Sequence, residues 1–120
     1  MKIIIESRDE LRVIDLADVL YLHASHNYTD FHFADGRQKS VLLNLSALEE
    51  QIAAAAEAAQ RRNPFLRVGR SLLVNTDLVE LVSVKLNKIA FRTAPPIYLE
   101  ATRQVLMRLK AAMSAAGGEA

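Results

Sequence analysis

The chain of 120 residues contains no cysteine and no tryptophan, and it has only four glycines and three prolines. Without cysteine the protein forms neither disulfide bonds nor thiolate metal sites, which fits a reducing cytoplasm. No stretch of about 18 apolar residues is free of charge, and the apolar run near the N-terminus is too short for a signal peptide. We therefore expect a cytoplasmic protein that is neither secreted nor embedded in a membrane.

The sequence also lacks the marks of common catalytic and cofactor sites. None of the four glycines stands at a strand-to-helix turn of the kind that cradles phosphate. Ser71 has no histidine or acid beside it in sequence that could activate it as a nucleophile. His23, His26 and His32, even with Asp30, do not show the spacing of a compact metal site. We predict no enzymatic activity, no cofactor and no metal.

Charge is distributed unevenly along the chain, although the formal net charge is only +1. Residues 1–59 carry five Lys or Arg and ten Asp or Glu, whereas residues 60–120 carry ten Lys or Arg and four Asp or Glu. A net charge near zero argues weakly against a nucleic-acid partner. The basic second half nevertheless permits a basic face that could meet phosphates.

A chain of this length forms one domain with its own core, and we place that domain at residues 1–116 with a short tail at 117–120. Apolar residues recur at every second position in many short segments, which predicts strands. The segments expected to form strands are 3–5, 11–14, 19–22, 28–34, 38–43, 65–68, 72–74, 78–86, 88–93 and 97–99.

Two segments are expected to be helical. Ser46 and Glu49 have the spacing of a capping box, so a helix is predicted from about residue 47 to 61, ended by Asn63-Pro64. Apolar residues near the C-terminus recur at helical spacing, and Gly117-Gly118 would stop that helix. These apolar residues are Val105, Leu106, Leu109 and Met113. The predicted fold class is mainly β with two helices.

The run from Phe65 to Asn75 predicts a strand, an exposed basic turn and a second strand. Arg70 and Ser71 fall at the interruption between the two strands. The guanidinium is a planar fork of donors that suits phosphate or the edge of guanine. An ordinary solvated arginine is the alternative, and the local sequence leaves both open.

The order and spacing of several motifs resemble a LytTR-type DNA-binding domain, the output module of many bacterial response regulators. The resemblance runs from about residue 14 to 109. It rests on Asp18-Val19-Leu20-Tyr21-Leu22, Asn27-Tyr28, Asp35-Gly36, Leu45-Ser46-Ala47-Leu48-Glu49, the run from Phe65 to Asn75, and Thr102-Arg103. It implies an elongated stack of small antiparallel sheets, from which loops enter successive major grooves of DNA.

The resemblance also implies roles for particular residues. It implies contact with bases or phosphates for Asn27 and Arg70, and contact at the groove edge for Arg103. Asn pairs bidentately with adenine and Arg with guanine, and the Ser71 hydroxyl can donate to phosphate. Lys88, together with Lys85 and Arg92, could contact the DNA backbone, or these residues could line a solvated strand face.

Family members commonly have histidine where this chain has Gly69, so a supporting contact is missing. Glycine can instead adopt a positive φ and bring Arg70 closer to a partner. Asn75 is expected to be structural, with its amide satisfying the turn at Thr76-Asp77. The aromatic residues assigned to the core are Tyr21, Phe31, Phe65 and Phe91.

We therefore expect sequence-specific binding of double-stranded DNA and regulation of transcription, with two copies reading direct repeats as a homodimer on DNA. We expect the domain to act without a receiver domain, so that a separate regulatory protein or its own abundance controls it. By resemblance, standalone members are often coupled to a membrane-protein antagonist. The alternative is a protein-interaction module of the same fold that has lost DNA affinity and binds its partner through the last helix or an exposed strand edge.

Overall fold

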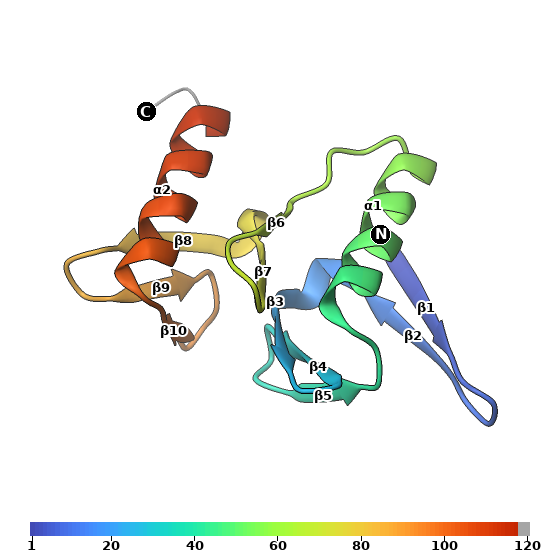
Figure 1. Cartoon of the computed structure of the whole chain (residues 1–120). Coiled ribbons are helices and arrows are strands. Elements are labelled where there is room, and N and C mark those ends of the chain that lie inside the picture. Colours follow the sequence, from blue (N-terminus) through green and yellow to red (C-terminus); the bar gives the residue numbers. More distant parts are fainter. Residues whose placement is uncertain (118–120) are drawn as a thin grey trace.

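The structure, a computed structural model, describes residues 1–117 and contains ten strands and two α-helices within them (Figure 1). The strands are β1 (Lys2–Glu6), β2 (Leu11–Asp15), β3 (Val19–Ser25), β4 (Tyr28–Phe33), β5 (Gln38–Val41), β6 (Phe65–Arg67), β7 (Leu72–Asn75), β8 (Val79–Ser83), β9 (Lys88–Phe91) and β10 (Tyr98–Glu100). The helices are α1 (Leu45–Ala58) and α2 (Arg103–Gly117). Neither of these helices has the length and apolar content that crossing a membrane requires.

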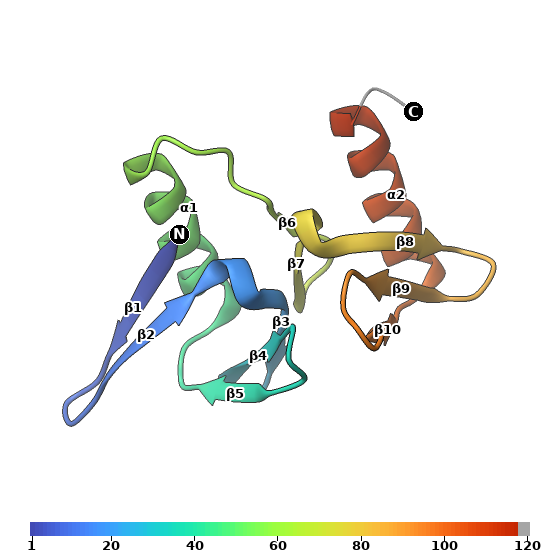
Figure 2. The same cartoon turned by 180° about the vertical axis from the view of Figure 1, so that it is seen from behind.

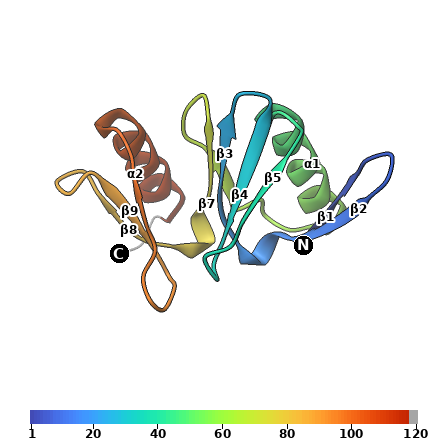
Figure 3. The same cartoon turned by 90° about the horizontal axis from the view of Figure 1, so that it is seen from below.

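The strands form three antiparallel sheets, in agreement with the stack of small antiparallel sheets that the resemblance implies. The central sheet has the order β5-β4-β3-β7-β6, and it lies between the β1-β2 hairpin and a sheet of order β10-β9-β8. Figures 2 and 3 show these parts side by side along the long dimension of the molecule. The principal extents of 45 × 30 × 28 Å confirm an elongated body.

The central sheet is covered on one face by α1. Along β4, Thr29, Phe31 and Phe33 are buried while the residues between them are more exposed, which is the period-2 pattern of a strand with one covered face. Phe31 packs in one core cluster with Leu48 and Ile52 of α1, all three fully buried. The amphipathic helix and the alternating strands thus bury each other's apolar faces.

The opposite face of the central sheet is covered in part by the three-stranded sheet and α2. A second core cluster joins Leu72 and Val74 of β7 to Phe91 of β9 and Leu106 of α2. The rings of Tyr21 and Phe91 stack with their centroids 5.7 Å apart. The assignment of the four aromatic residues to the core is therefore confirmed.

The predicted bounds of the first helix are wrong at both ends. Asn44, not Ser46, is the N-cap, because its Oδ1 accepts from the Ala47 N–H at 2.8 Å. At the other end Gln60 adopts φ 54°, and the Arg61 N–H bonds the Ala56 carbonyl. This left-handed cap ends α1 several residues before Asn63-Pro64.

The second helix presents the predicted apolar face to the core. Leu106 and Leu109 are fully buried, and Val105 and Met113 are half-buried against the same cluster. Gly117 is the last residue of α2. Gly118, the second half of the predicted stop, lies outside the described residues, as does the rest of the tail.

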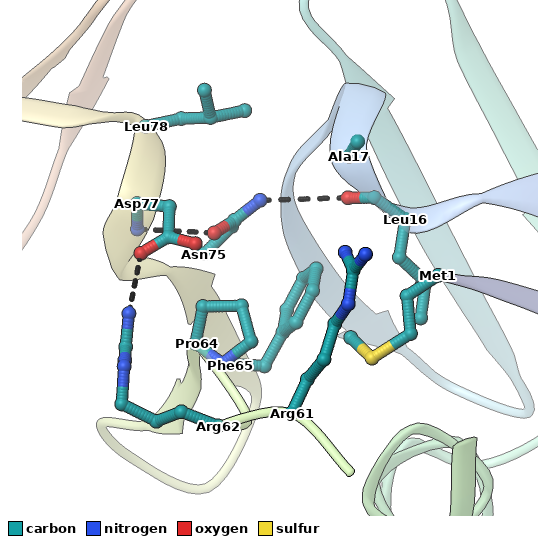
Figure 4. Close-up of a pocket in the computed structure, with 10 residues that line it drawn as sticks. All are labelled: Met1, Leu16, Ala17, Arg61, Arg62, Pro64, Phe65, Asn75, Asp77 and Leu78. Atoms are coloured by element: carbon teal, nitrogen blue, oxygen red, sulfur yellow. Dashed lines mark hydrogen bonds and ion pairs between the residues drawn. The ribbon is translucent and has the colours of Figure 1, made fainter. Parts of the chain in front are cut away.

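Asn75 is buried at the end of β7, and Figure 4 shows its bonds with Asp77 and with the Leu16 carbonyl. Its Oδ1 accepts from the Asp77 N–H at 3.1 Å, which caps the 3-10 turn Thr76–Leu78. Its Nδ2 donates to the Val19 carbonyl at 2.9 Å, across 56 residues of sequence. The structural role predicted for Asn75 is confirmed, and the bond to Val19 adds a long-range connection to the local cap.

Asn75→Ala is expected to lower the free energy of unfolding by about 1–2 kcal/mol, because it removes a cap and leaves the Val19 carbonyl without its donor. Urea denaturation measures the loss. Asn63→Ala is the matched control, since within residues 1–117 the Asn63 side chain makes one bond, a local one to the Phe65 N–H. Equal losses for the two variants would contradict the long-range role of Asn75.

Candidate nucleic-acid interface

The turn between β6 and β7 holds Arg70 out in solvent. Val68 is fully buried, and its N–H donates to the Leu72 carbonyl at 3.0 Å, which closes the turn at its base. The Ala24 N–H donates to the Ser71 carbonyl at 2.8 Å, so the turn is also fastened to β3. Arg70 is exposed, and its side chain makes no ion pair with any residue in the described part of the chain. The predicted exposed basic turn is present.

The turn between β3 and β4 lies at the same end of the central sheet. Ser25 pairs with Tyr28, so His26 and Asn27 form a two-residue hairpin turn in which His26 has φ 58°. Both residues are exposed. Because β3 and β7 are antiparallel neighbours, this turn and the Arg70 turn project from one edge, as Figure 3 shows.

The start of α2 lies against the Arg70 turn. Thr102 caps this helix, with its Oγ1 accepting from the Val105 N–H at 3.3 Å. A Cβ added to Gly69 would lie 3.6 Å from the Val105 side chain, an ordinary contact distance. Arg103 is exposed in this first helical turn. We call the edge formed by residues 26–27, 68–71 and 102–105 the turn edge.

Gly69 does not use the positive φ that glycine permits. Among the glycines that the structure describes, only Gly36 has one, with φ 90°. Gly69 therefore brings no unusual backbone to the Arg70 turn. An added Cβ would also meet Val105 of α2 at an ordinary contact distance, so the approach of α2 does not require glycine at this position.

The structure places four of the five predicted site residues on the turn edge, and the fifth lies on the three-stranded sheet, beside the strand β10 that leads into α2. Asn27, Arg70, Ser71 and Arg103 lie on the turn edge, with Ser71 half-buried. Lys88 lies on the three-stranded sheet, in register with Glu100. Its Nζ is 4.1 Å from the centroid of the Tyr98 ring, so this amine has a cation-π partner.

Arg67 contacts the backbone of the turn edge, and the sequence analysis did not identify it. Its guanidinium donates from Nε to the Gly69 carbonyl at 2.8 Å and from Nη2 to the Arg70 carbonyl at 2.6 Å. Its Nη1 pairs with Glu49 Oε1 of α1 at 2.7 Å. Strand alternation indicates only that Arg67 lies on the face opposite Leu66, and the partner is 18 residues away in sequence.

The three histidines, His23, His26 and His32, lie in the β3-β4 hairpin. No cluster of three potential ligands occurs among residues 1–117. His32 stacks on Tyr21 with ring centroids 4.2 Å apart, and burial lowers its pKa below the ordinary value, against the opposing effect of Asp30. His32 is therefore mostly neutral at pH 7 and adds little positive charge to the central sheet.

A pocket of about 280 Å³ opens at the opposite end of β3 and β7 from the turn edge (Figure 4). Its wall includes Asn75, Phe65 and Leu16, and Arg62 at its rim is paired with Asp77 at 2.7 Å. The residues of the turn edge do not line it. The pocket is therefore separate from the candidate interface.

Comparison with known proteins agrees with this architecture. No curated protein sequence matches the chain significantly. A solved structure, the LytTr DNA-binding domain of a Bacillus cereus protein described as a methyl-accepting/DNA response regulator, matches with a TM-score of 0.57 and 13% identity, over 92% of this chain and 94% of that one. At this identity the match supports the fold alone. The family model described as the LytTr DNA-binding domain matches residues 9–114, and this chain therefore belongs to the LytTR family of DNA-binding domains.

Proposed function

We propose that this domain binds double-stranded DNA sequence-specifically and regulates transcription, with the turn edge facing the DNA. The observation that carries the proposal is the Arg70 turn, where an exposed guanidinium stands on a backbone fastened to β3 and closed over buried Val68. Recognition of base edges requires donors held in a fixed geometry, and a side chain on a rigid turn meets that requirement.

Each residue of the turn edge has a role suited to its chemistry. Arg70 would read guanine through two parallel hydrogen bonds, and Asn27 would read adenine. Ser71 and Arg103 would bind phosphates and set the register of the protein on the duplex. The long dimension of the molecule is 45 Å, so a domain lying along B-DNA would span more than one helical turn, about 34 Å.

We further propose that residues 1–116 act as one domain and that two copies bind direct repeats side by side. Selection of bound sites from a random duplex library with purified protein tests these points together. The expected result is a repeated motif whose two halves are spaced by about one helical turn, 10 to 10.5 base pairs, or a multiple of it. Absence of enrichment with demonstrably folded protein would contradict the proposed function.

Lys88→Ala is expected to weaken binding to all duplexes alike and to reduce the slope of log affinity against log salt by about one unit, if Lys88 meets a phosphate. Titrations at several salt concentrations measure the slope. Lys2→Ala, on the exposed outer face of β1, is the matched control. An unchanged slope in Lys88→Ala would mean that the amine serves only its contact with Tyr98.

A protein-interaction module is the second candidate function, and the β1-β2 hairpin favours it. Ile4, Leu11 and Val13 expose 56%, 56% and 54% of their surface on this hairpin. Such a patch is typical of contacts with another protein, including a regulatory one. Salt separates the two functions, because affinity for phosphates falls steeply with ionic strength and an apolar contact hardly responds.

A further inference from the structure

The half-buried guanidinium of Arg67 makes three contacts inside the protein, one from each of its nitrogens. It bonds two successive carbonyls of the Arg70 turn, those of Gly69 and Arg70, and its remaining edge pairs with Glu49. The side chains of Arg67 and Glu49 are 28% and 39% exposed, so solvent screens this pair less than a pair on the open surface. The planar fork makes three contacts whose directions are mutually fixed, which a lysine cannot reproduce.

These contacts restrain the part of the turn that the backbone leaves free. The backbone bonds of the turn hold Val68 and Ser71, at its two ends. Gly69 and Arg70 lie between them, and the bonds from Arg67 are what hold their carbonyls. Fixing the Arg70 carbonyl fixes the origin of the Arg70 side chain, so fewer arrangements remain to be lost when it meets a base.

Glu49 connects this restraint to a rigid element. It follows Leu48 in α1, and Leu48 and Ile52 are fully buried against the central sheet. The carboxylate therefore has a fixed base from which to orient the guanidinium. The restraint passes from the packed helix, through one ion pair of 2.7 Å, to the backbone of the turn.

We propose that Arg67 is a positioning residue for DNA recognition, which holds the Arg70 turn in its binding geometry without touching DNA, and that Glu49 orients it. This inference rests on the proposed function. An ion pair that only added stability would affect all DNA sequences equally. A positioning role affects the preferred sequence far more than the others.

The test compares Arg67→Lys and Glu49→Gln with two matched controls. Arg62→Lys changes an arginine whose ion pair with Asp77 lies at the other end of the sheet, and Glu50→Gln changes an exposed neighbour of Glu49. The measurements are the affinity ratio between the selected duplex and a scrambled one, the salt slope on scrambled DNA, and the backbone ¹⁵N relaxation of Gly69 and Arg70 in the free protein.

Arg67→Lys is expected to lower the affinity ratio by about threefold to tenfold, the size of the entropy lost on ordering a mobile side chain or loop. It should also raise the mobility of Gly69 and Arg70 while leaving the salt slope unchanged. Glu49→Gln should act in the same direction with a smaller effect. The double variant should show no more than Arg67→Lys alone, because both residues serve one restraint. The two controls should behave as wild type.

Distinct outcomes overturn distinct claims. An unchanged affinity ratio in Arg67→Lys, with wild type still selective, overturns the positioning role and leaves the proposed function intact. A salt slope reduced by about one unit in Arg67→Ala, which removes the charge, also overturns it, since Arg67 would then contact phosphate itself. A wild-type protein that selects no sequence overturns the proposed function, whatever the variants do.

Discussion

Arg70→Ala is expected to weaken binding of the selected duplex by about 1–3 kcal/mol and to relax selectivity at one base position. The side chain is exposed and unpaired within the described residues, so its removal deprives the fold of no contact. The thermal unfolding midpoint should therefore remain that of wild type. Competition between the selected site and its single-base variants measures both the loss and the position affected.

Two further variants separate base reading from simple attraction to DNA. Arg70→Lys retains the charge but not the planar fork, so it should retain the salt slope and still lose discrimination at that position. Arg8→Ala removes an exposed arginine from the β1-β2 hairpin, away from the turn edge, and should leave selectivity as it is. Unchanged discrimination in Arg70→Ala would show that Arg70 reads no base.

Most of the fold could be predicted because the strands carry local signals. The alternation of apolar and polar residues along β4 predicts one buried face, and the apolar run of β7 predicts a fully buried strand. Asn87, the residue between the predicted strands 78–86 and 88–93, has φ 57° in the turn between β8 and β9. Short strands with clear turn residues leave few other arrangements.

The predicted ends of α1 are wrong because the sequence offers more than one suitable capping residue. Asn44 and Ser46 are both good N-caps, and only the path of the chain after β5 decides between them. The C-terminal cap uses Gln60 in a left-handed conformation. Glycine or asparagine at this position would have indicated such a cap in the sequence, and glutamine does not. The prediction used Pro64, four residues after Gln60, as the end signal and therefore extended the helix too far.

The turn edge was predictable in part. Arg70 and Asn27 stand in turns that sequence places, but the closeness of these turns depends on the pairing of β3 with β7. The contacts of Arg67 could not be predicted from the sequence, because the two carbonyls and the carboxylate that it bonds are brought to it only by folding. Glu49 was assigned to a capping box that does not form, although its true partner is on another element.

Phe91→Ala is expected to lower the free energy of unfolding by about 3–5 kcal/mol, because a fully buried aromatic ring is replaced by a cavity. For a domain of this size the midpoint should fall by about 10–20 °C. Calorimetry and urea denaturation measure the two quantities. Phe91→Leu should cost much less, and Tyr98→Ala, at a site 52% exposed, should change stability by less than about 1 kcal/mol.

The shape of the Phe91→Ala transition distinguishes one cooperative unit from two. The two core clusters share strands, since β3 contributes Leu22 to one cluster and Leu20 and Tyr21 to the other, and β7 contributes Leu73 to one and Val74 to the other. Loss of the ring that stacks on Tyr21 should therefore weaken both clusters together, with a single transition seen by every probe. Two separate transitions would show that the three-stranded sheet and α2 unfold by themselves. In that case the contact between the first turn of α2 and Gly69 would break before the central sheet and its turns unfold.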